Sequence, residues 1–137
     1  MRGSRVADLT PWPDPHKVLK LGLADLGAVK IVGPRTPRNF RDDGYPVDTV
    51  RRIGGANTAD KQTDVARMAI DSYHTDYDGC LAHAEAIRQR LISGSLRTDA
   101  GVCDRGEVEV APILLPYSDS TVFVFGAIYR LSFRRSR

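Results

Sequence analysis

Three histidines and one short acidic run carry the residue types with which this sequence could do chemistry. His16, His74 and His83 could serve as general bases or metal ligands. His74 lies in the run 73–79, Tyr-His-Thr-Asp-Tyr-Asp-Gly, whose ending is similar to the start of a calcium loop. The run lacks the further acceptors and the distal bidentate glutamate of such a loop, and His83 has no His or Glu four residues away. We therefore interpret the run as the cap of a helix.

The glycine pair Gly54-Gly55 follows a predicted strand but has no Lys-Ser or Lys-Thr behind it, so it is interpreted as a turn and not as a phosphate loop. A Gly-x-Ser-x-Gly nucleophile motif is absent from the sequence. Together with the isolated histidines, these observations predict no catalytic residue, no metal site and no cofactor. We expect that the protein is not an enzyme.

Cys80 and Cys103 are 23 positions apart and belong to no zinc-binding spacing. Cys80 lies on the apolar stripe of a predicted helix, which favours a buried, inert thiol. Cys103 lies in a predicted polar loop, where it could be exposed.

Two amphipathic helices are predicted. Asp14 precedes Pro15 as an N-cap precedes a proline at the first helical position, and the helix that starts there ends before Gly27. A second helix, capped by Thr75 or Asp76, is predicted to run to about residue 93, because apolar residues recur in it at spacings of three and four.

Strands are predicted at 28–32, 47–53, 65–73, 108–115 and 121–133. The last two are joined by the short turn 116–120, which indicates an antiparallel pair. These elements predict an α+β fold, with a mainly antiparallel sheet of about five strands and two main helices packed on one side. The 137 residues contain no repeat and no linker, so a single domain is expected over 1–137, with an extended N-terminal arm at 1–12 where prolines begin.

The overall charge is modest, +3 at pH 7, which argues against a dedicated DNA-coating protein. No apolar run approaches the roughly 18 residues of a membrane span, so we expect no association with a membrane. We expect the protein to be synthesised in the cytoplasm. The charges are unevenly distributed: residues 30–52 hold six basic and three acidic groups, whereas residues 99–121 hold one basic and five acidic groups. Oppositely charged segments on one chain suit head-to-tail self-association.

The order and spacing of the elements resemble those of the tail terminator proteins of long-tailed bacteriophages. The resemblance extends over about residues 15–135. It rests on the early helix, the strand that ends in Val-Arg-Arg-Ile-Gly-Gly at 50–55, the strand 64–73, the helix containing Ala-Glu-Ala-Ile at 84–87, and the long final strand 124–134. It implies a structural virion protein that forms a homohexameric ring, caps the tail tube, stops tube polymerisation and joins the tail to the neck.

The same resemblance implies a location at the head–tail junction and three kinds of partner: other copies of the chain, the tail tube protein, and a head-closure or connector protein. Genomic DNA would pass through the lumen without sequence-specific binding. The basic loop, the strand end after it and the loop 54–64 supply the candidate interface residues. These residues are Arg35, Arg38, Arg41, Arg51, Arg52, Asn57, Asp60 and Lys61.

Two alternatives remain open on the sequence. The first is another neck component, such as a head-closure or tail-completion protein. The second is a small nucleic-acid-binding regulatory domain, which the terminal arginines Arg130, Arg134, Arg135 and Arg137 suggest.

Overall fold

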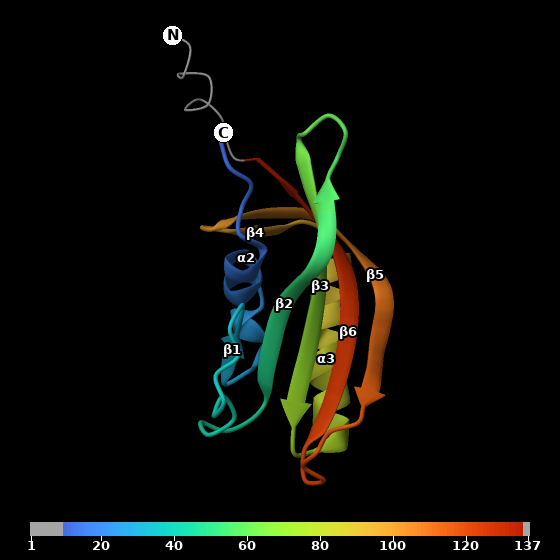
Figure 1. Ribbon diagram of the computed structural model, residues 1–137. Coiled ribbons are helices and arrows are strands. Elements are labelled where there is room, and N and C mark those ends of the chain that lie inside the picture. The colour runs from blue at the N-terminus through green and yellow to red at the C-terminus, as the bar shows by residue number, and fades with distance from the viewer. Residues whose placement is uncertain (1–9, 136–137) are drawn as a thin grey trace.

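A six-stranded sheet dominates the structure, a computed structural model that describes residues 10–135 (Figure 1). The elements in chain order are α2 (Pro15–Gly22), the 3₁₀ helix η1 (Ala24–Leu26), β1 (Lys30–Val32), β2 (Val47–Asn57), β3 (Thr63–His74), α3 (Tyr77–Ile92), β4 (Leu96–Thr98), β5 (Gly101–Leu115) and β6 (Phe123–Arg134). The predicted arm at 1–12 lies largely outside the described residues.

The predicted fold class is wrong. The strands are ordered β1-β2-β3-β6-β5-β4, and β1 pairs with β2 in parallel, so the sheet is mixed and has one strand more than expected. It curls into a half-barrel, and the helices are short beside it (Figure 1). The sixth strand, β4, was missed because it has three residues and only Leu96 is buried, which leaves no alternation to detect.

The core lies between the two α-helices and one face of the sheet. Alternate residues of β3, Ala66, Met68 and Ile70, are buried on this face. They pack with the apolar side chains of α2 and its C-cap, of α3 and of β6, the largest of which are Leu19, Leu23, Ile87, Leu91, Tyr129, Leu131 and Phe133. Because side chains alternate across a strand, the intervening residues of β3 point to the opposite face. No helix of residues 10–135 covers this face, which we call the open face.

Both α-helices begin where the sequence predicts. Asp14 caps α2 by accepting from the backbone N–H of His16, with Pro15 in the first turn. Asp76 caps α3 by accepting from Gly79 N at 2.8 Å. The first helix is shorter than expected, since α2 ends at Gly22 and the chain continues as η1 before Gly27 turns it with φ 103°.

Gly54 and Gly55 do not form the predicted turn. Strand β2 continues through both residues to Asn57, and the register shifts between Arg52 and Gly54, which marks a β-bulge. Gly55 has φ 105°, and a Cβ atom there would lie 1.9 Å from the carbonyl oxygen of Val65. The bulge therefore depends on glycine at this position.

Cys103 is not in a polar loop either. It lies in β5, is almost fully buried, and burial raises its pKa to about 11. Cys80 is buried in α3, as predicted, and its pKa is likewise raised to about 11 by burial. Among residues 10–135, no helix is both long and apolar enough to cross a bilayer.

Candidate protein interface

The β2–β3 hairpin carries three of the predicted interface residues at its tip. Asn57 ends β2, and Asp60 and Lys61 are exposed in the turn that follows. Asp60 accepts from the Thr58 hydroxyl at 2.5 Å and from Gln62 N at 3.1 Å, and Lys61 takes a left-handed conformation with φ 60°. These bonds give the tip a defined shape, although it projects beyond the rest of the sheet (Figure 1).

The connection 33–46 between β1 and β2 carries three more of the predicted interface residues, Arg35, Arg38 and Arg41. Arg35 and Arg38 are exposed, and neither makes a salt bridge within the described residues. The Arg41 guanidinium lies 5.4 Å from the ring centre of Phe40 and 5.2 Å from that of Tyr117, so it is held against the β5–β6 connection.

The hairpin tip and Arg41 lie at opposite ends of the molecule. In Figure 1 the hairpin tip projects at the top, whereas the lower end of the β1–β2 connection and the β5–β6 connection lie at the bottom. We call these ends the hairpin pole and the loop pole. The candidate residues thus do not form one site.

Two adjoining hollows mark the open face between the poles. One, of about 250 Å³, is lined by Thr36, Thr49 and Tyr73 in addition to Arg51, Ala69 and Asp71. The other, of about 220 Å³, shares those last three residues, and its remaining lining is mostly apolar: Val110, Ile113, Leu115, Gly126, Ala127 and Ile128. The hollows therefore form a polar end and an apolar end that meet at Arg51 and Asp71. Burial raises the pKa of Asp71, and the charge of Arg51 opposes that shift.

A charged cluster spans three strands near the same face. Glu109 accepts from Arg67 Nε at 2.9 Å and from Arg130 Nε at 3.0 Å. The hydrogen bonds from these two guanidinium groups lower the pKa of Glu109 to about 2. The cluster joins β5, β6 and β3 and leaves one net positive charge.

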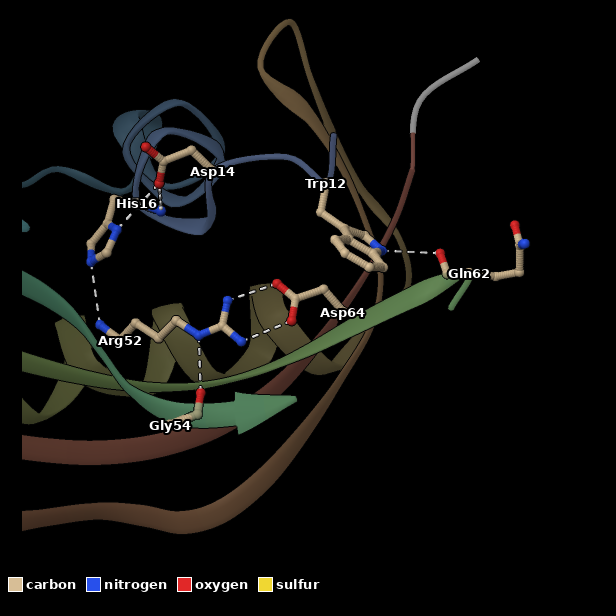
Figure 2. A network of polar contacts seen from close by, with 7 residues as sticks. All are labelled: Trp12, Asp14, His16, Arg52, Gly54, Gln62 and Asp64. Atoms are coloured by element: carbon tan, nitrogen blue, oxygen red, sulfur yellow. Dashed lines mark hydrogen bonds and ion pairs between the residues drawn. The ribbon is translucent and has the colours of Figure 1, made fainter. Parts of the chain in front are cut away.

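Arg52, unlike its neighbour Arg51, forms side-chain hydrogen bonds within residues 10–135. Its guanidinium donates to both carboxylate oxygens of Asp64, at 2.7 and 2.8 Å, and its Nε donates to Gly54 O at 3.0 Å (Figure 2). Its backbone N–H donates to Nε2 of His16 at 3.2 Å. Arg52 therefore holds the bulge of β2 against β3 and connects the start of α2 to β2. Because most of its hydrogen-bond donors are used inside the chain, few remain for a partner protein.

We expect Arg52→Ala to lower the free energy of unfolding by about 1–3 kcal/mol, because it leaves the buried Asp64 carboxylate without its two-pronged partner. Arg51→Ala is the matched control. Its side chain is exposed on the open face, and its removal should change stability by less than about 0.5 kcal/mol. Urea unfolding of both variants measures the difference, and equal losses would contradict the role given to Arg52.

One buried polar pair was not predicted. Nε2 of His83, on α3, lies 2.8 and 2.9 Å from the two carboxylate oxygens of Asp48, on β2, and both side chains are almost fully buried. Burial acts to lower the pKa of His83, but the hydrogen bond and charge of Asp48 outweigh it, so the pKa is raised above 6.5. The residues are 35 positions apart, and no spacing rule links them.

The remaining chemistry-bearing residues do not converge. Nδ1 of His74 accepts from Thr75 N at 2.8 Å, beside the α3 cap, and His16 pairs with Asp14. In the part of the chain from 10 to 135, no three His, Cys, Asp or Glu side chains gather as metal ligands would. The features that stand out are surfaces: the two poles and the open face with its hollows.

Comparison with known proteins gives a likeness of fold. No protein-family model matches the sequence, and no curated protein matches it. Among solved structures, a chain from a structure titled "Virion of native gene transfer agent (GTA) particle" is similar, with a TM-score of 0.56 and 14% sequence identity. The likeness covers 82% of this chain and 84% of that chain, so the two share a fold over nearly their whole lengths.

Proposed function

We propose that this protein is a structural component of a phage-like virion, and specifically a tail terminator that assembles as a homohexameric ring at the head–tail junction. The observation that carries the proposal is the fold shared with a chain of a gene transfer agent virion over 82% of the sequence. The element order that resembles tail terminators adds the finer assignment. The proposal gives the protein no catalytic reaction.

The arrangement of the candidate interface residues supports such a role. A terminator contacts the tail tube on one side and the neck on the other, and this chain carries its exposed candidate loops at opposite poles (Figure 1). We propose that one pole docks on the tube protein and the other on a head-closure or connector protein, and that DNA passes through the ring without base readout.

Deleting the gene tests this assignment. A terminator stops tube growth, so we expect the mutant to produce tails of abnormal and mostly excessive length, visible by negative-stain electron microscopy. Complementation with the wild-type gene should restore one length. Tails of normal length that fail to join heads would instead identify another neck component, a head-closure or tail-completion protein, and normal infectious particles would reject both.

A further inference from the structure

One lateral edge of the sheet, the outer side of β5, lacks a neighbouring strand over most of its length. Strand β4 pairs with β5 only at residues 101–103, and within the described part of the chain no strand pairs with the outer side of 104–115. Val108, Ile113 and Leu114 on this stretch are exposed, and Ile113 and Leu114 each expose 50% of their surface. We call 104–115 the β5 edge. An exposed edge with apolar side chains is the usual template for pairing with another chain.

The opposite lateral edge is formed by α2 and β1, and it is also apolar. Leu21 is 54% exposed and Val29 49% exposed. A hollow of about 190 Å³ lies there, lined by Ala24, Ala28, Val29 and Ile31, with the ammonium-bearing Lys20 and Lys30 among its walls. We call this surface the α2–β1 edge. In Figure 1 it lies at the left of the molecule and the β5 edge at the right.

One acid and one base remain available for a contact between the two edges. On the β5 edge, Asp104 is bound by Arg134 and Glu109 by Arg67 and Arg130, whereas Glu107 pairs only with the exposed Arg105 of its own strand. On the α2–β1 edge, Lys30 is bound by Asp43 and Asp25 by Arg90, whereas Lys20 makes no salt bridge within residues 10–135. Glu107 and Lys20 are therefore the opposite charges that the two edges can pair with each other.

We infer that the β5 edge of one copy docks on the α2–β1 edge of the next, with Ile113 against the hollow beside Val29 and with Glu107 facing Lys20. Five of the seven exposed large apolar side chains of the described chain lie on these two edges, and such a contact covers them. The two surfaces differ, so the contact is heterologous and repeats around an axis. The inference rests on the proposed ring and names the surfaces that close it.

Thiol cross-linking tests the contact directly. Val29→Cys and Ile113→Cys are prepared as separate full-length proteins, mixed, and treated with a short bis-maleimide, both as purified protein and in assembled particles. The native thiols of Cys80 and Cys103 are buried with a pKa raised to about 11, so they react slowly. We expect a covalent dimer in the mixture and almost none with either variant alone. Ile92→Cys, exposed on α3, replaces Val29→Cys in the control mixture and should give none.

Charge reversal provides a second test that does not depend on cross-linking geometry. Glu107→Lys should weaken self-association in sedimentation measurements, and mixing it with Lys20→Glu should restore it. Both residues are surface positions, so the fold should tolerate the changes.

A dimer formed by Ile113→Cys alone would indicate a two-fold contact and overturn the inference, as would a lack of dimer in every mixture and in particles. The two proposals fail separately. Absence of the protein from virions would reject the proposed function, whereas its presence there without the Val29–Ile113 cross-link would reject only these edges.

Discussion

Replacing Asp48 by alanine is expected to lower the free energy of unfolding by about 3 kcal/mol or more, although Asp48 touches none of the proposed interfaces. The variant keeps His83 in a site from which water is excluded and removes the carboxylate that accepts from its Nε2 at 2.8 Å. A buried polar group left without its partner bears the full cost of its lost hydration. Thermal and urea unfolding measure the loss, and Asp42→Ala, an exposed loop position, is the control.

The pH dependence of the same variant identifies the source of the loss. Because the pKa of folded His83 is raised, protonation of His83 stabilises the wild type fully below pH 6.5 and ceases to do so as pH rises through the raised pKa. The stability difference between wild type and Asp48→Ala should therefore be largest in mildly acidic solution and shrink toward alkaline pH. A difference that stays constant with pH would show that the pair carries no charge in the fold.

Gly55→Ala is expected to lower the free energy of unfolding by a comparable amount, about 2–4 kcal/mol, because of the backbone conformation at this position. Its φ of 105° is strained for any residue with a side chain, and the added Cβ would meet the Val65 carbonyl oxygen of the neighbouring strand at 1.9 Å. Backbone on β3 cannot move aside without breaking the ladder, so the bulge itself must rearrange.

The adjacent glycine supplies the control for this prediction. At Gly54 a Cβ atom would meet only the Arg67 side chain at 3.7 Å, and φ is not positive there. Gly54→Ala should therefore be nearly neutral in the same urea titration. Equal losses in the two variants would mean that general strand propensity, and not the bulge, decides the effect.

Local signals in the sequence predicted the helices better than the sheet. The spacing of apolar residues and the cap at Asp76 located α3, because both are encoded within a few neighbouring residues. The parallel pairing of β1 with β2 and the three-residue β4 depend on contacts made by distant parts of the chain. Gly54-Gly55 looked like a turn because a bulge and a turn both use glycine for the same conformational reason.

At the candidate interface, too, the sequence indicates residue types, whereas their positions depend on contacts between distant parts of the chain. In the sequence Arg51 and Arg52 are equivalent basic neighbours, but adjacent strand residues point to opposite faces. Arg52 therefore binds Asp64, while Arg51 lies on the open face. For the lateral edges, the sequence offers only the contrast between the basic segment 30–52 and the acidic segment 99–121. Which side chains line each edge was decided by strand order, which no local pattern contains.

Trp12, the single tryptophan of the sequence, lies where the two ends of the described chain meet the β2–β3 turn at Gln62 (Figure 2). Its indole donates to the Gln62 carbonyl at 3.3 Å, and the Arg135 guanidinium lies 4.1 Å from its ring. The protein consequently contains an intrinsic fluorophore next to one of its two proposed docking ends. Shifts in indole emission can follow the binding of a partner there on the unlabelled chain, while binding at the far end should leave the spectrum unchanged.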